Sequence, residues 1–206
     1  MEKNIHKVVL ATKYRPKNFK ELIGQDIMAE TITNSIKLTR LPNAWMLSGI
    51  RGVGKTTTAR LIAQAINCKK SFFQGEKCNS EEHCSCREIS EFKNLDVIEI
   101  DGAQHTGVDS IKELIASCLY APTTTKYKVI IADEFQMLSK SSFAALLKTL
   151  EEPPPHLKFI FCTTELKKIP VTIISRCQRF DLHRVPIRDL LANLKKILKI
   201  ENGKIS

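Results

Sequence analysis

Residues 49–56 constrain the fold more than any other stretch, because they spell Gly49-Ile50-Arg51-Gly52-Val53-Gly54-Lys55-Thr56. This is the G-x-x-x-x-G-K-T pattern of a phosphate-binding P-loop. An apolar run at 44–47 precedes it as an expected strand, and residues 57–67 follow with helical periodicity. In such a strand–turn–helix unit, unpaired backbone N–H groups and the helix dipole converge on a phosphate. A chance glycine-rich turn would explain the motif alone, but not the motif with its flanks.

The side chains of this unit have distinct expected roles. Lys55 is expected to reach the outer phosphates of a nucleotide, and the Thr56 hydroxyl is expected to bind Mg²⁺. Thr57, the next residue, is grouped with residues 49–56 as part of the nucleotide-binding set.

A second motif is acidic. The apolar run 129–132 ends in Asp133-Glu134, the pattern of a Walker B motif. Next to a P-loop, Asp133 would hold Mg²⁺ and Glu134 would orient or deprotonate the attacking water. An acidic pair after a strand is also a common helix-start signal, so its position downstream of a P-loop decides in favour of the functional interpretation.

The rest of the chain alternates expected strands and helices. Strands are predicted at 44–47, 95–100, 128–132, 159–162 and 178–182. Helices are predicted at 26–38, with Asp26 as a possible cap, and at 57–67, 108–119, 141–150 and, after a break at Pro186, around 190–198. This order predicts an α/β fold with a five-stranded parallel sheet covered by helices on both faces.

Composition bounds the class of protein. The 206 residues carry a net charge of +10, which suits a polyanionic partner but also fits a solvated basic surface. No apolar run is long enough to span a membrane, and the start lacks a signal-peptide apolar region, so a cytoplasmic protein without a membrane partner is expected. Four of seven cysteines cluster at 68, 78, 84 and 86, which favours a metal over disulfides.

A long ordered series of motifs resembles the gamma/tau family of bacterial DNA polymerase III, the AAA+ ATPase of the clamp loader. The matching residues cover almost the whole chain. They are Tyr14-Arg15-Pro16, Phe19, Gly24-Gln25, 49–56, 98–103, 120–122, Asp133-Glu134, 137–139, 145–154, Thr163-Thr164, 168–170 and Ser175-Arg176-Cys177.

The resemblance implies roles that composition does not assign. Arg176 would be an arginine finger in a neighbouring subunit's ATP site, since its fork of donors matches phosphate oxygens. The alternative is an arginine that caps the preceding short helix. Thr164 matches the sensor position that contacts the γ-phosphate or its water, with Thr163 as competitor. Residues 14–16 would pack against the nucleotide; the alternative is that they only pack against other parts of the protein.

The family also carries a four-cysteine zinc module between the P-loop helix and the next strand. Cys68, Cys78, Cys84 and Cys86 lie in that place and would bind zinc. The spacing departs from the family pattern, because the third ligand falls on His83 with Cys84 one residue later. Either side chain could complete the site. Cys118, Cys162 and Cys177 are expected to be buried or motif cysteines.

The resemblance divides the chain into an AAA+ nucleotide-binding domain at 1–183, with the zinc module at 68–86 as an insertion, and the start of a helical lid at 184–206. It implies ATP, Mg²⁺ and zinc as cofactors. Its implied partners are the other clamp-loader subunits (delta, delta-prime and gamma/tau), the sliding clamp and primed DNA. Polymerase chemistry would belong to the partners.

Two functions stay open at this point. The first is an ATPase that loads the clamp, with Lys55, Asp133, Glu134, Thr164 and Arg176 as its catalytic set. The second is a short gamma/tau-like protein that binds ATP or partners without productive hydrolysis, because only the start of the lid is present. A P-loop transferase such as a nucleoside kinase is a third class, for which the sequence offers no acceptor site.

Overall fold

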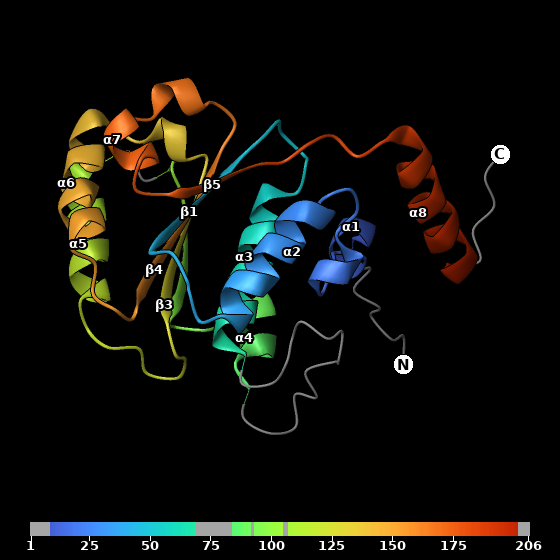
Figure 1. Cartoon of the computed structure of the whole chain (residues 1–206), viewed down its shortest axis with the longest axis horizontal. Coiled ribbons are helices and arrows are strands. Elements are labelled where there is room, and N and C mark those ends of the chain that lie inside the picture. Colours follow the sequence, from blue (N-terminus) through green and yellow to red (C-terminus); the bar gives the residue numbers. More distant parts are fainter. Residues whose placement is uncertain (1–8, 69–83, 92, 105–106, 202–206) are drawn as a thin grey trace, which may run out of the picture.

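A five-stranded parallel sheet forms the centre of the protein in the computed structural model, which describes residues 9–68, 84–91, 93–104 and 107–201 (Figure 1). The strands are β1 Ala44–Ser48, β2 Val97–Asp101, β3 Lys128–Asp133, β4 Leu157–Thr163 and β5 Gln178–Asp181. Their order across the sheet is β2-β3-β4-β1-β5, and every neighbouring pair is parallel. The predicted α/β class with five parallel strands is confirmed.

Helices cover both faces of this sheet (Figure 1). One face carries α2 Asp26–Lys37, α3 Lys55–Asn67 and α4 Cys86–Ser90, with the short α1 Leu10–Lys13 beside them. The other face carries α5 Val108–Cys118, α6 Lys140–Glu151 and α7 Val171–Ile174. The last helix, α8 Ile187–Ile200, lies beyond α1 and away from the sheet. Single 3₁₀ turns occur at η1 Phe19–Glu21, η3 Phe135–Met137 and η4 Leu166–Lys168.

The strands feed two separate cores because successive side chains of a strand point to opposite faces. Trp45 and Leu47 of β1 pack with α2 and α3, whereas Met46 between them packs with the core under α5 and α6. Both faces of β1, β3 and β4 are buried, which explains why their sequences are continuous apolar runs rather than alternating ones.

The strand register places the functional segments along one edge. Ser48 of β1 is level with Thr163 of β4, and Asp101 of β2 is level with Asp133 of β3. All these residues end their strands, so the loops that follow them meet at the carboxyl edge of the sheet. Ligand sites of open α/β sheets lie at this edge.

Several predicted boundaries need correction. Asp26 is the first residue of α2 rather than its cap, since Gln25 occupies the N-cap position. The P-loop helix begins at Lys55, two residues before the apolar periodicity starts, and α4 was not foreseen. Pro186 does precede α8 as its N-cap. The domain division at residue 183 stays a prediction.

In the parts of the chain that the structure describes, no helix is both long and apolar enough to cross a lipid bilayer.

Candidate nucleotide site at the carboxyl edge of the sheet

The loop between β1 and α3 has the geometry of an anion-binding turn. Gly54 caps α3 with φ of 102°, a left-handed conformation that a residue with a side chain rarely adopts. The helix therefore begins directly at Lys55 and Thr56, and its first backbone N–H groups face the loop. This end of α3 is suited to a negatively charged group.

The Lys55 side chain lies against the same loop. Its Nζ donates to the carbonyl oxygens of Gly49 at 2.9 Å and Ile50 at 3.0 Å, and only 6% of the residue is exposed. An ammonium group has three donors, so Lys55 is fixed inside the loop while it keeps donor capacity for a phosphate.

The two expected Mg²⁺ ligands are in contact. The Thr56 hydroxyl donates to Asp133 Oδ2 at 2.5 Å, across the gap between α3 and the end of β3. The other carboxylate oxygen of Asp133 accepts the backbone N–H of Glu134 at 2.9 Å. A hydroxyl and a carboxylate are the oxygen donors that a hard cation such as Mg²⁺ prefers, so this donor pair fits the ion.

Glu134 is held in a polar network that involves a residue the motifs did not identify. Gln136 Nε2 donates to Glu134 Oε2 at 2.6 Å and to Thr164 Oγ1 at 2.8 Å. The Thr164 hydroxyl also lies 3.4 Å from Glu134 Oε2, whereas the fully buried Thr163 hydroxyl donates to Gln136 Oε1 at 2.7 Å. Of the two threonines proposed for the sensor position, Thr164 is the one beside the acidic pair.

The sequence offered one signal that Gln136 could belong to the site: it is a single polar residue in an apolar run. The run is Phe135-Gln136-Met137-Leu138, and a polar residue there must be exposed or hydrogen-bonded. Gln136 is 7% exposed and uses both ends of its amide.

An open cavity of about 960 Å³ lies beside the P-loop. Its walls come from the N-terminal segment, the start of α3 and helix α8. The lining includes Tyr14, Arg15, Pro16, Val53, Gly54, Thr57, Asn193 and Lys196. Residues 14–16 and Thr57, which the sequence assigns to the nucleotide, thus line one cavity, and their contact with a nucleotide stays a prediction.

The α8 wall of the cavity is tied to the N-terminal segment. Glu201, directly after α8, accepts from Lys13 Nζ at 2.5 Å and from the Tyr14 hydroxyl. These exposed contacts join two segments that are far apart in the sequence, and the cavity lies between them.

Positive charge gathers at the inner wall. Burial lowers the pKa of the Arg15 guanidinium, and the neighbouring Arg60 lowers that pKa further, whereas Glu99 opposes the shift. Arg60 makes a two-pronged ion pair with Glu99, at 2.8 and 2.6 Å. Two guanidinium groups thus lie near a single carboxylate, which is paired with Arg60, and this excess of positive charge favours a negatively charged ligand nearby.

Arg176 lies elsewhere, two residues after the end of α7. Its guanidinium donates to Glu151 Oε1 at 2.8 Å and to the Thr172 carbonyl at 2.6 Å. The second bond is the helix-capping contact considered as the alternative to an arginine finger. Arg176 does not line the cavity beside the P-loop.

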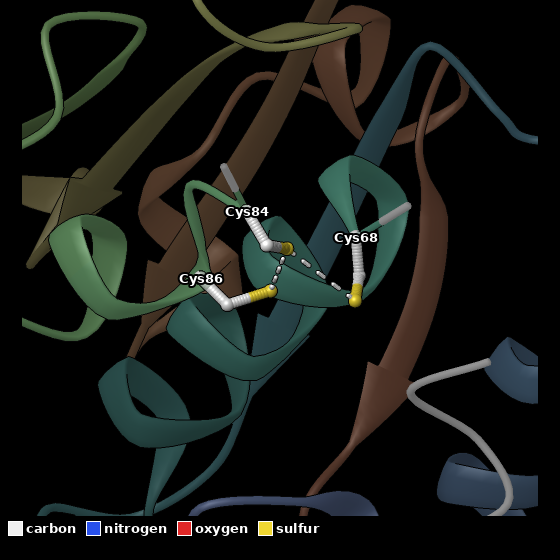
Figure 2. A group of neighbouring side chains, drawn as sticks. All are labelled: Cys68, Cys84 and Cys86. Carbon is white, nitrogen blue, oxygen red and sulfur yellow. Dashed lines mark hydrogen bonds between the residues drawn. The ribbon is translucent and has the colours of Figure 1, made fainter. Parts of the chain in front are cut away.

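Three of the four expected zinc ligands meet between the end of α3 and the start of α4 (Figure 2). The sulfurs of Cys68 and Cys84 are 3.8 Å apart, those of Cys84 and Cys86 are 3.3 Å apart, and all three lie within 4.8 Å of one another. Two thiolates on a tetrahedral zinc with bonds of about 2.3 Å would be roughly 3.8 Å apart, so the arrangement fits the ion. Cys84 is in the cluster; Cys78 and the competing His83 lie outside the described residues.

The other three cysteines that the structure describes are separate from this group. Cys118 and Cys162 are fully buried, and burial raises the pKa of the Cys177 thiol to about 12. They are inert packing groups, as expected from the sequence.

Comparison with known protein families gives one match that spans most of the chain. The family model described as DNA polymerase III, delta subunit, matches residues 24–186. Among curated proteins, DNA polymerase III subunit gamma of Buchnera aphidicola subsp. Schizaphis graminum is 47% identical over 193 residues, covering 93% of this chain and 52% of that protein. DNA polymerase III subunit tau of Escherichia coli K12 is 42% identical, with coverages of 94% and 30%. The chain thus spans about half the length, or less, of these relatives.

Solved structures share the fold at lower identity. The RuvB Holliday junction branch migration motor of Thermotoga maritima superposes with a TM-score of 0.66 at 19% identity, covering 94% of this chain and 56% of that one. A DNA polymerase III gamma subunit-related protein of the same organism gives a TM-score of 0.54 at 22% identity, with coverages of 85% and 54%. These likenesses show the fold, that of P-loop AAA+ proteins.

Proposed function

Since this chain belongs to the family of DNA polymerase III, delta subunit, we propose that it is an ATP-binding subunit of clamp-loader type that hydrolyses ATP. The observation that carries the proposal is the 2.5 Å contact between Thr56 and Asp133, one from the P-loop helix and one from the end of β3. No local motif creates this pairing; it needs the whole sheet to bring residues 77 positions apart together.

Binding would use the P-loop and the adjacent cavity. The N-terminal turn of α3 and the Lys55 ammonium would hold the phosphates, and the cavity wall at Tyr14, Arg15 and Pro16 would contact the nucleoside. Thr56 and Asp133 would hold Mg²⁺, which when bound neutralises charge on the phosphates.

Hydrolysis would use the groups at the ends of β3 and β4. Glu134 would orient a water and accept its proton, and Thr164 would donate its hydroxyl toward the terminal phosphoryl group; the hydrogen bonds that link these two side chains support the pairing. Both side chains follow strands that end next to the P-loop, so they share the edge that holds the phosphates.

Arg176 would act on a neighbouring subunit. It does not line the cavity of its own chain, and its ion pair with Glu151 is partly exposed, with side-chain exposures of 34% and 53%. An exposed pair of this kind costs little to break, so a phosphate on an adjoining subunit can compete for the guanidinium.

The partners follow from the named relatives. Those proteins are DNA polymerase III subunits, and we propose that this chain assembles with other clamp-loader subunits to place a sliding clamp on primed DNA. The net charge of +10 is compatible with a polyanionic partner. Zinc at Cys68, Cys84 and Cys86, with Cys78 as the expected fourth ligand, would be structural, since Cys68 follows the end of α3 whereas the P-loop precedes its start.

The proposal is tested by measuring ATP binding and Mg²⁺-dependent ATP hydrolysis, with and without a sliding clamp and primed DNA. Lys55→Ala removes charge-assisted bonds to phosphate and is expected to weaken ATP binding by about 10- to 100-fold. Glu134→Gln should retain binding but lower turnover by about 10²- to 10⁴-fold. Lys93→Ala, an exposed lysine paired with Glu91, is the matched control and should leave both unchanged.

Two results would contradict the proposal in different ways. Turnover that Lys55→Ala and Glu134→Gln leave unchanged would mean that the activity belongs to a contaminant. Binding of ATP without hydrolysis at any protein concentration, with clamp and DNA present, would leave the second function in place: a subunit that only binds nucleotide or partners.

A further inference from the structure

The amide of Gln136 has only one orientation that satisfies its neighbours. The backbone N–H of Thr164 can only donate, and it points at one end of the amide at 3.3 Å. The Thr163 hydroxyl accepts from the Glu165 N–H at 3.1 Å and keeps its own hydrogen to donate to the same end of Gln136, 2.7 Å away. Two donors require an acceptor, so this end is Oε1.

The NH₂ end must then face Glu134 and Thr164. Its two hydrogens are both used, one on Glu134 Oε2 at 2.6 Å and one on Thr164 Oγ1 at 2.8 Å. Because Thr164 Oγ1 already accepts from Gln136, the hydroxyl's single hydrogen is free to point elsewhere. In the structure it points at Glu134 Oε2, 3.4 Å away. Glu134 Oε2 thus accepts from two donors.

The backbone beneath this network leaves Glu134 little freedom. Glu134 has φ of 45° and ψ of 44°, in the left-handed region, and its carbonyl accepts the N–H of Met137 at 2.9 Å. Gly102 packs against that carbonyl so closely that a Cβ there would lie 2.5 Å from the oxygen. The position of the carboxylate is therefore set by its hydrogen bonds to Gln136 and Thr164.

We propose that Gln136 is a positioning residue that couples Glu134 to Thr164, so that a terminal phosphoryl group bound at Thr164 changes the hydrogen bonding of the Glu134 carboxylate. The inference rests on the proposed function and deepens it. A phosphoryl oxygen that takes the Thr164 hydrogen removes one donor from Glu134 and leaves the carboxylate on Gln136 alone. The carboxylate then keeps its place but regains a lone pair for water.

Two substitutions separate this role from simple packing. Gln136→Leu removes both halves of the amide, and misplacement of a reacting group by about 1 Å costs roughly 100-fold in rate, so turnover should fall by about 10- to 100-fold. KM for ATP should rise no more than about threefold, the order expected for one neutral hydrogen bond. Thr163→Ser keeps the donor that fixes the amide and should behave as wild type, whereas Thr163→Val should lose part of the turnover.

The decisive comparison repeats Gln136→Leu in a Glu134→Gln background. If Gln136 acts through Glu134, its substitution should change residual turnover by less than about twofold there, because the effects of groups that act as a unit are not additive. Gln64→Leu is the matched control. It makes the same change at an equally buried glutamine, 7% exposed, whose amide donates to the Cys86 carbonyl at 3.2 Å. It should lower turnover by the same factor, if any, in both backgrounds.

Dissociation constants of Mg²⁺·ATP and Mg²⁺·ADP form a second arm that needs no turnover. Gln136→Leu should weaken ATP about threefold and leave ADP unchanged, since only ATP brings a phosphoryl group to Thr164. An equal 10- to 100-fold loss of turnover in both backgrounds would overturn the inference while the proposed function stands. Binding of nucleotide without hydrolysis would contradict the proposed ATPase activity. The binding measurements would then decide the coupling by themselves: weaker binding of ATP alone by Gln136→Leu would support it, and equal weakening of ATP and ADP would overturn it. A chain that binds neither nucleotide would overturn both.

Discussion

The two edges of the sheet differ in what their side chains do. At the carboxyl edge, Lys55 and Thr56 begin α3 and Asp133 ends β3, beside an open cavity that Gly54 and Thr57 line, and these side chains retain capacity for a ligand. At the amino edge, polar side chains form hydrogen bonds within the protein. Asn67, the last residue of α3, bonds both the N–H and the carbonyl of Tyr127, just before β3. Helix α3 therefore runs from the edge with the candidate nucleotide site to the edge where polar side chains hold the loops in place.

Asp96 is the strongest anchor of the amino edge. It is 1% exposed and accepts the backbone N–H groups of Thr123, Thr124 and Thr125, together with the Thr124 hydroxyl, at 2.7–3.0 Å. These bonds fix the loop that leads into β3. The cysteine cluster lies at the same end of α3, since Cys68 directly follows Asn67. Stability should depend on this edge and ATP turnover on the other.

Among the tests of this comparison, a substitution at Asp133 is expected to have the largest effect, and that effect should be confined to the carboxyl edge. Asp133→Asn removes the charge that would hold Mg²⁺ and weakens the partner of the Thr56 hydroxyl, so ATP turnover should fall by about 10²- to 10³-fold, as for loss of one preorganised electrostatic contact. The melting temperature should change little. Turnover assays beside thermal unfolding check both parts, with Asp109→Asn at the exposed start of α5 as the control. A variant that turns over ATP normally would refute the assigned role of Asp133.

Removing zinc should break the amino edge instead. Metal analysis is expected to find one zinc per chain, and a chelator should lower the melting temperature by roughly 5–10 °C if zinc had been present at 100 times its Kd. The Kd for ATP should stay within about twofold, the scatter expected for uncoupled sites. Cys86→Ser should reproduce the loss, whereas Cys177→Ser, outside the cluster, should retain the metal. Metal-free protein with unchanged stability would contradict a structural zinc.

Asp96→Asn should have the smallest effect, with a distinctive pH dependence. Burial alone would raise the pKa of Asp96, but the N–H groups of Thr124 and Thr123 and the Thr124 hydroxyl together lower that pKa below its usual value. A lowered native pKa means that the ionised side chain adds stability above the unfolded pKa of about 3.9, and that this stability is lost as pH falls through the native value.

At pH 7 the substitution should therefore cost about 1–3 kcal/mol of unfolding free energy, and the cost should shrink as the pH approaches 3. Urea unfolding at both pH values measures it, with Asp26→Asn at the exposed start of α2 as the control. A cost that is the same at both pH values would mean that the hydrogen bonds do not depend on the charge.

The same two edges show where sequence reasoning works. The P-loop and Asp133-Glu134 were predictable because each follows a buried apolar strand, and parallel strands bring their carboxyl ends together. Asp26 was placed one position wrong because Gln25, which offers no side-chain cap bond, occupies the N-cap. Such a boundary depends on the incoming chain rather than on local preference.

Contacts between distant segments were beyond the sequence. Gln136 bonds Thr164 across 28 positions, and Arg176 bonds Glu151 across 25, so neither partner is visible in a local pattern. The cysteine spacing left His83 and Cys84 as alternatives, and the fold brings the sulfur of Cys84 to Cys68 and Cys86. Spacing within a turn-rich segment does not fix which side chain points inward; the packing of α4 on α3 does.

The central claim, that nucleotide chemistry belongs to the carboxyl edge and anchoring to the amino edge, is tested most directly by one calorimetric titration. Mg²⁺·ATP is titrated into the wild-type chain, the chelator-treated chain and the Lys55→Ala variant at a temperature where all three are folded. We expect the same Kd for the first two, and a Kd about 10- to 100-fold weaker for Lys55→Ala. The account would be contradicted if Lys55→Ala left the Kd for ATP unchanged, or if removal of the metal abolished ATP binding.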